Sequence, residues 1–273
     1  AAILFQPAPP SETEPSPAPT LTPAPTEQVL APTPLPPAQI ESPVIFREGI
    51  VGQVQRINPL FAGLNPVDRD ITRLVFEGLV GTNQYGEYIP VLAESWTIAS
   101  TRLEYVFQLR QDVLWQDGLP FTAADVTTTI HLLQAPGDAL PADLTAFWRT
   151  VEVELLDEYT VRFRLAQPLA SFLDHLRIGI LPAHVFSGLS AEQLVTHPFN
   201  LSPIGTGPYE LVDGSRGDSI TFKKFDDYLG EPAKTDTLVF RWSAEGAQRL
   251  LELQSGSVDG IDNPTPDDFA VIE

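Results

Sequence analysis

The four histidines are the side chains best suited to bind a metal ion or to transfer protons near neutral pH. They are His131, His175, His184 and His197, and they lie far apart in the sequence. None has a second histidine or a carboxylate at a spacing that is typical of metal ligands. Cysteine is absent, which excludes thiolate ligands and disulfides. We therefore expect no metal site and no cofactor.

Two short motifs suggest chemistry but are better explained by folding. GTGPYE, residues 205–210, lacks the third glycine of a dinucleotide loop, and the predicted strand follows the glycines, so a turn that feeds a strand is favoured. RGD, residues 216–218, lies where a hairpin tip is expected, and an adhesion tripeptide is a weak alternative because three residues recur by chance. No serine has the Gly-x-Ser-x-Gly setting of a hydrolase. We therefore expect no enzyme.

The stretch WQDGLPFTAADV, residues 115–126, predicts a strand, a turn and a helix in close succession. Asp117 and Gly118 form a turn, because glycine accepts a positive φ and the aspartate can bond the backbone two residues on. Thr122 and Asp125 fit a capping box, and Phe121 and Val126 fit a hydrophobic staple. The role of this stretch is expected to be architectural.

The segment VEVELLDEYTVRFRLAQP, residues 151–168, predicts a β-hairpin. A three-residue loop at 157–159 places Glu154 opposite Arg162, Glu152 opposite Arg164 and Val153 opposite Phe163. Further strands are predicted at 103–110, 207–212, 219–225 and 237–242, and helices at 70–78, 122–133, 190–198 and 243–256. Because these strands and helices alternate without a strict rhythm or a repeat, we expect an α/β or mixed α+β fold.

Residues 1–43 hold 13 of the 27 prolines, four acidic residues and no Lys or Arg. This composition predicts a disordered Pro-rich linker. The initial AAILF resembles the end of a longer apolar segment, and since the chain has no Met we expect that a signal or anchor segment precedes it. Of the formal charge of −20, the linker carries −4, which leaves −16 on the remainder and disfavours binding to nucleic acid. Export is favoured over the alternative, an acidic cytoplasmic domain on a linker.

Six blocks occur in order along the chain: INPLFAGLNPVDRDITRLVFEGLV, GEYIPVLAESW, LEYVFQLRQDVLWQDGLPFTAADV, PIGTGPYELV, ITFKKFDDYLGEPAKTDTLVFRW and RLLELQSGSVDGIDNPTPDDF. From about Val44 to Glu273 this succession resembles the extracellular solute-binding proteins of family 5, the peptide-binding components of ABC importers. The resemblance implies a type II periplasmic-binding-protein-like lobe with an inserted subdomain, and a second lobe missing from this chain. It implies a lobe core at 44–78 and 179–273 and the inserted subdomain at 79–178.

The resemblance also implies a ligand site and partners. The backbones of Gly63, Leu64 and Asn65 match a segment that faces the cleft, and Asp262 and Asn263 lie at the expected crossing between lobes. An ordinary loop and an ordinary hinge turn stay open as alternatives. The expected partners are an oligopeptide or another small solute and an ABC permease, although relatives also take nickel chelates, sugars or opines. The expected location is extracellular or periplasmic, with a tether to the cytoplasmic membrane, and the alternative function is a sensory ectodomain of the same fold.

Overall fold

The computed structural model describes residues 42–213, 217–243, 246–264 and 269. Residues 42–273 form one compact unit. Its helices and strands are, in chain order, β1 Ile45–Val51, η1 Ala62–Leu64, α1 Pro66–Val75, β2 Val80–Thr82, β3 Tyr88–Pro90, β4 Ala93–Ile98, β5 Glu104–Leu109, α2 Ala123–Gln134, α3 Ala142–Trp148, β6 Val151–Asp157, β7 Thr160–Leu165, α4 Phe172–His175, α5 Ala183–Phe186, α6 Ala191–Leu194, η2 Pro198–Leu201, β8 Tyr209–Asp213, β9 Ser219–Lys224, β10 Thr237–Ser243, α7 Gly246–Gln254 and β11 Gly260–Ile261. The expected mixed α/β architecture is confirmed.

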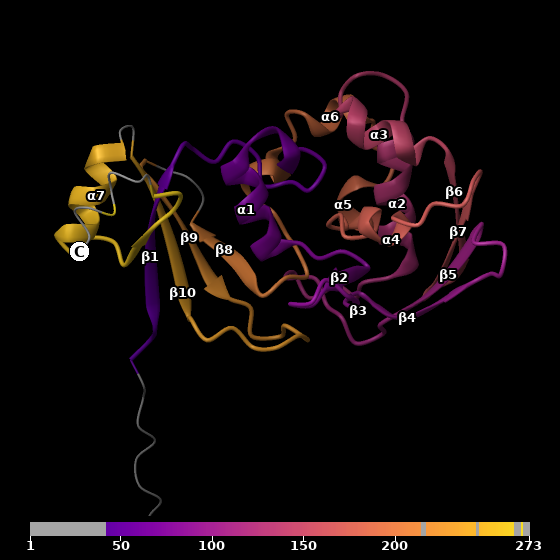
Figure 1. Cartoon of the computed structure of the whole chain (residues 1–273), viewed down its shortest axis with the longest axis horizontal. Helices are drawn as coiled ribbons and strands as arrows, with labels where there is room; N and C mark the ends of the chain where they lie inside the picture. The colour runs from indigo at the N-terminus through magenta and orange to yellow at the C-terminus, as the bar shows by residue number, and fades with distance from the viewer. Residues whose placement is uncertain (1–41, 214–216, 244–245, 265–268, 270–273) are drawn as a thin grey trace, which may run out of the picture. The chain divides into compact units, whose positions relative to one another are not determined.

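A five-stranded sheet has the order β11-β1-β10-β9-β8. Strand β1 is parallel to both β10 and β11, whereas β10, β9 and β8 are antiparallel. The predictions of strands at 207–212, 219–225 and 237–242 are therefore confirmed. Ile220 and Phe222 alternate with more exposed neighbours along β9 and are buried. Figure 1 shows α7 and α1 on opposite sides of the β1–β10 pair.

Helix α1 begins earlier than predicted. It starts at Pro66, not at Asp70, because the Asn65 side chain accepts a hydrogen bond from the backbone N–H of Val67 (3.1 Å) and proline suits the first helical turn. It ends at Val75, so the predicted extension to Gly78 is wrong. Pro66 thereby sets the N-terminal turn of α1 beside η1.

The C-terminal end of α1 packs against the turn before β8. The backbone N–H of Gly207 donates to the Val75 carbonyl at 2.8 Å. A Cβ on Gly205 would lie only 1.8 Å from that same carbonyl oxygen, so the turn accepts no side chain there. GTGPYE is therefore a turn that feeds a strand, as predicted.

A four-stranded antiparallel sheet, in the order β4-β5-β7-β6, carries the predicted hairpin. Glu154 lies opposite Arg162, Glu152 opposite Arg164 and Val153 opposite Phe163, so the predicted register is confirmed. The loop is shorter than predicted, because Asp157 pairs with Thr160 across an irregularity after Leu155.

One ion pair of this hairpin does not follow the strand register, because Arg164 lies opposite Glu152 but binds other glutamates. Arg162 binds Glu154 at 2.5 Å, whereas Arg164 binds Glu104 (3.1 Å) and Glu154 (3.3 Å). Strand β5 therefore supplies the second carboxylate, because it lies on the other side of β7.

The stretch 115–126 forms the predicted joint. Gly118 has φ +84°, and the Asp117 carboxylate accepts from the backbone N–H of Leu119 at 3.2 Å. Thr122 caps α2, and both parts of the capping box with Asp125 are present. Trp115, Phe121 and Val126 are buried, as the architectural interpretation requires.

Asp125 connects this joint to the start of α5 at Ala183. Its carboxylate accepts hydrogen bonds from the backbone N–H of Thr122 (2.7 Å), the indole N–H of Trp115 (3.4 Å) and the backbone N–H of Ala183 (2.6 Å). Burial raises the pKa of Asp125, and these hydrogen bonds act in the opposite direction. Turn, helix and the start of α5 therefore share one buried carboxylate.

Other sequence predictions have mixed outcomes. The helix predicted at 190–198 is wrong in length, because α6 has only four residues and η2 begins at Pro198. Helix α7 ends before Gly256, as predicted, and that glycine has φ +71°. The linker at 1–43 lies almost entirely outside the described residues, as does the start of the RGD motif. The boundaries proposed at residues 78 and 178 stay predictions. No helix in the described part of the chain combines the length and the apolar content of a membrane span.

Replacing Thr122 with Ala should lower the free energy of unfolding by about 1 kcal/mol, because the capping box loses its hydroxyl. Thr122→Ser keeps that hydroxyl and should retain most of the stability. Urea denaturation of the three proteins tests this. An unchanged stability of Thr122→Ala would show that the cap contributes nothing to α2.

Candidate functional site

The segment Gly63–Asn65 forms an exposed ridge at the N-terminal end of α1. A Cβ placed on Gly63 would meet no atom within 4 Å, and Leu64 is 62% exposed. The Asn65 amide is already engaged, since it accepts from Val67 and donates to the Gln53 carbonyl at 2.9 Å. This ridge therefore offers its backbone and one aliphatic side chain, and not the Asn65 amide.

Beside the ridge lies a hollow of about 370 Å³, which we call the η1 hollow. Its lining includes Gly63, Leu64, Leu144, Trp148 and His175. Trp148 is fully buried, and within the described residues its indole N–H has no hydrogen-bond partner. A buried donor without an acceptor is costly, so the wall of the hollow contains a polar group whose hydrogen bond the described residues do not supply.

His175 contributes an aromatic surface to the same hollow. Its ring stacks on Phe147 with 3.8 Å between the centroids. Burial lowers the pKa of His175, with Asp174 acting in the opposite direction. The neutral form of the imidazole is therefore favoured, and the hollow combines apolar and aromatic groups with the carboxylates of Asp143 and Asp174.

A second, larger depression of about 620 Å³ lies between α1 and the end of β1, and we call it the α1–β1 groove. Pro66 and Val67 line it from α1, and Asp262 and Asn263 line it from the segment after β11. The two candidate segments thus border different depressions, because Gly63 and Leu64 line the η1 hollow and Asp262 and Asn263 line the groove. No hydrogen bond between the two segments occurs among the described residues.

Asp262 has a structural task in this groove. Its Oδ1 accepts from Arg249 Nη1 at 2.7 Å and from the backbone N–H of Val51 at 3.2 Å. Its own backbone N–H donates to the Gly49 carbonyl at 3.1 Å. Asn263 is exposed and has φ +40°. The Asp262 side chain therefore fastens the end of β11 to β1, and Asn263 is the more accessible of the two.

The α1–β1 groove is acidic as well as apolar. Glu48, Asp70 and Asp262 line it together with Ile50 and Phe240. Burial raises the pKa of Glu48, and the charges of Asp262 and Asp70 raise it further. A cationic or amphipathic group suits such a surface better than an anion does.

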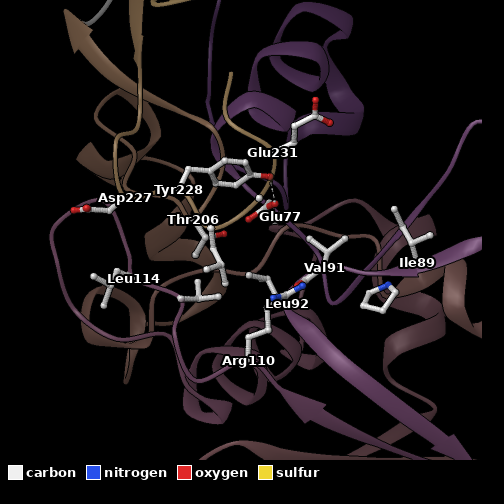
Figure 2. Close-up of a pocket in the computed structure, with 14 residues that line it drawn as sticks. Glu77, Ile89, Val91, Leu92, Arg110, Leu114, Thr206, Asp227, Tyr228 and Glu231 are labelled. Atoms are coloured by element: carbon white, nitrogen blue, oxygen red, sulfur yellow. Dashed lines mark hydrogen bonds between the residues drawn. The ribbon is translucent and has the colours of Figure 1, made fainter. Parts of the chain in front are cut away.

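A third depression, the junction cavity, has a volume of about 240 Å³ and is drawn in Figure 2. Its polar lining includes Glu77, Arg110, Thr206 and Tyr228. Sequence reasoning did not identify this cavity, because its residues come from five separate segments with no spacing in common. Each signal was local, for example a helix end at Glu77 or a strand end at Arg110.

Among the described residues, no group of three or more His, Asp or Glu side chains is arranged to hold a metal ion. His184, one of the four histidines, binds the Asp117 carboxylate at 2.8 Å. This contact lies beside Trp115, whose ring centroid is 6.3 Å from that of His184. Both groups therefore belong to the joint around Trp115.

Comparison with known proteins gives a family match over most of the chain. The model for bacterial extracellular solute-binding proteins, family 5 Middle, matches residues 87–273. The glutathione-binding protein GsiB of Escherichia coli O1:K1 / APEC is 30% identical over 204 residues, which cover 72% of this chain and 39% of GsiB. The chain thus spans about two fifths of the length of the curated relatives it matches.

Solved structures agree with the fold. NikZ from Campylobacter jejuni in complex with Ni(L-His) matches with a TM-score of 0.70 and 31% identity over 78% of this chain and 42% of NikZ. The oligopeptide-binding protein AppA from Bacillus subtilis, in complex with a nonapeptide, matches with a TM-score of 0.71 and covers 80% of this chain and 44% of AppA. At 23% identity, AppA supports the fold alone.

Asn65→Ala should lower the free energy of unfolding by about 1 kcal/mol, because α1 loses its cap. Gly63→Ala should change it by less than about 0.5 kcal/mol, since the added methyl group meets open space. Chemical denaturation of both variants measures these changes in the free energy of unfolding and shows which of the two residues stabilises the fold. A large loss for Gly63→Ala would mean that the ridge itself depends on that glycine.

The raised pKa of Glu48 predicts a pH dependence of stability. The folded protein binds the proton of the Glu48 carboxyl more tightly than the unfolded chain does. Its contribution to the free energy of unfolding is therefore fully present below the ordinary pKa of 4.5 and is lost as the pH rises through the pKa of the folded state. The unfolding free energy of the wild type should therefore fall, relative to Glu48→Gln, as the pH rises above 4.5. Urea denaturation across this pH range tests it, and parallel profiles would contradict it.

Proposed function

Since the chain belongs to the bacterial extracellular solute-binding proteins of family 5, we propose that it forms one lobe of a non-catalytic receptor that delivers a peptide to an ABC importer. The observation that carries the proposal is the η1 hollow, which is lined by an accessible backbone ridge and by Trp148, whose buried indole N–H has no acceptor among the described residues. Both features suit a ligand that presents repeated carbonyl and N–H groups. A peptide backbone does so at every residue.

The choice of a peptide rests on the chemistry of the ridge. Gly63 leaves room for another backbone to approach, and Leu64 can cover an apolar side chain of the ligand. GsiB is a glutathione-binding protein and NikZ was solved with Ni(L-His), and both ligands contain amino acid groups. A short peptide shares those groups with each of them.

The proposed binding uses two lobes. A ligand held between two surfaces loses most of its water only when both surfaces contact it, so one lobe supplies only part of the binding energy. Gly63, Leu64 and Asn65 would contribute backbone contacts from this chain, and Asn263 would lie near the passage to the second lobe. The Asp262 side chain supports that passage through Arg249.

The proposed cellular setting follows from the family and from composition. Members of this family are extracellular or periplasmic proteins, and we propose the same compartment for this chain. The Pro-rich segment 1–43 would act as a spacer between the folded unit and a membrane tether. The permease partner would meet the assembled receptor, not the spacer.

Residues 1–273 alone should bind tri- to pentapeptides at least a thousandfold more weakly than a polypeptide that also carries the second lobe. Several buried backbone hydrogen bonds and one charge-assisted contact, at about 1 to 3 kcal/mol each, would be missing, and each 1.4 kcal/mol is a factor of ten. Calorimetry of both proteins against a mixed peptide pool measures the difference. Micromolar binding by residues 1–273 would sink the two-lobe proposal.

Matched variants of the two-lobe protein test the ridge itself. Gly63→Leu should weaken peptide binding at least tenfold, because the new side chain occupies the approach to the backbone. Leu64→Ser should weaken it several-fold, whereas Leu251→Ser, at a position on α7 with the same exposure (63% against 62%), should leave it unchanged. Equal effects of Leu64→Ser and Leu251→Ser would remove the ridge from the proposed site.

A further inference from the structure

The junction cavity lies between two parts of the fold that are distant in sequence. Val91, Leu92 and Arg110 line it from the segments that flank β4 and β5, and Tyr228 lines it from the loop between β9 and β10. Three of its aliphatic lining residues, Ile89, Leu114 and Leu229, are 38%, 36% and 40% exposed, and the exposed Asp227 and Glu231 line it as well. The cavity is therefore accessible from solvent past aliphatic side chains and two carboxylates.

The inner part of the cavity contains a carboxylate that is held in place. The Tyr228 hydroxyl donates to Glu77 Oε1 at 2.8 Å, and Thr206 also hydrogen-bonds this carboxylate. Figure 2 shows Tyr228, Thr206 and Glu77 gathered at one side of the cavity, with the bond between Tyr228 and Glu77 drawn. Glu77 thus presents a fixed acceptor to whatever enters.

Arg110 faces this carboxylate from the opposite side. Its Nε donates to the Val91 carbonyl at 2.8 Å and its backbone N–H donates to the Leu92 carbonyl at 3.0 Å, which fixes the direction of the side chain. Figure 2 shows the guanidinium pointing toward Glu77, while the carboxylates of Asp227 and Glu231 point away from it. Within the described residues, the terminal nitrogens of Arg110 have no partner, and no ion pair joins Arg110 to Glu77.

A guanidinium and a carboxylate therefore line one cavity without contact. The space between them is best filled by a group that accepts hydrogen bonds from Arg110 and donates them to Glu77. A molecule with its own carboxylate and ammonium satisfies both charges at once, and an aliphatic group on the same molecule would contact Ile89, Leu114 and Leu229. We infer that the junction cavity binds a free aliphatic α-amino acid.

The size of the cavity agrees with this ligand class. A water molecule occupies about 30 Å³ in the liquid, so 240 Å³ corresponds to roughly eight waters, or a ligand with about as many non-hydrogen atoms. Leucine and its isomers are of this size. The site is separate in residues from the η1 hollow and does not depend on the proposed peptide-binding function.

The test uses calorimetry of residues 1–273 with L-leucine and two analogues that each lack one charge. 4-Methylpentanoate has no ammonium group, and isopentylamine has no carboxylate. L-Leucine should bind with a dissociation constant below about 1 mM, and each analogue should bind at least tenfold more weakly. Equal binding of either analogue and leucine would overturn the inference, as would the absence of saturable binding of leucine, which would leave a cavity that holds only water.

Variants assign the binding to this cavity. Glu77→Gln and Arg110→Gln should each weaken leucine binding at least tenfold, while the exposed controls Glu94→Gln and Arg73→Gln should leave it unchanged. Thermal unfolding establishes that each variant is folded, and the analogue series on the wild type decides the inference if either variant does not fold. Leucine binding that survives both substitutions in folded protein would place the amino acid elsewhere and overturn the assignment.

Discussion

The position of α1 determines where the ridge and its two neighbouring depressions lie, and a backbone contact holds that helix. The Val75 carbonyl accepts from Gly207 at 2.8 Å, and the closeness of Gly205 leaves no room for a side chain. At the other end, the buried carboxylate of Asp68 accepts from the backbone N–H groups of Gln55 (2.7 Å) and Arg56 (3.0 Å). The helix is therefore fixed at both ends by hydrogen bonds to irregular segments, and the ridge that precedes Pro66 is held in a defined position.

The sequence predicted those parts of the fold whose signals are local. The hairpin register followed from alternating residues and from arginines that face glutamates, because strand pairing repeats every two residues. The joint at Trp115 followed from turn and cap chemistry. The start of α1 lies four residues before the predicted Asp70, because Asn65 supplies the cap and Pro66 suits the first helical turn. The helix at 190–198 was overextended because Pro198 opens a new turn after His197.

Of the candidate site, too, only the part with a local sequence signal was predicted. The loop 63–65 was located from the sequence, but the occupation of the Asn65 amide by Gln53 and Val67 depends on tertiary structure. Trp148 gave no signal, because an unpaired indole is visible only when all its neighbours are known. The opposed charges of Glu77 and Arg110 likewise required the packing of distant segments. Local sequence patterns thus predict helices, strands and turns, whereas a cavity forms only where several of these elements pack together.

The two buried indoles have unequal surroundings, and this has an optical consequence. Trp115 already donates to Asp125, so a molecule that enters the η1 hollow leaves its surroundings unchanged. Trp148 lines that hollow and its indole N–H has no hydrogen-bond partner in the described part of the chain, so a new acceptor would change the polarity that its excited state experiences. Its emission would then shift in wavelength while that of Trp115 stays constant. The protein therefore carries its own fluorescent reporter of occupancy, with an internal reference of the same chromophore.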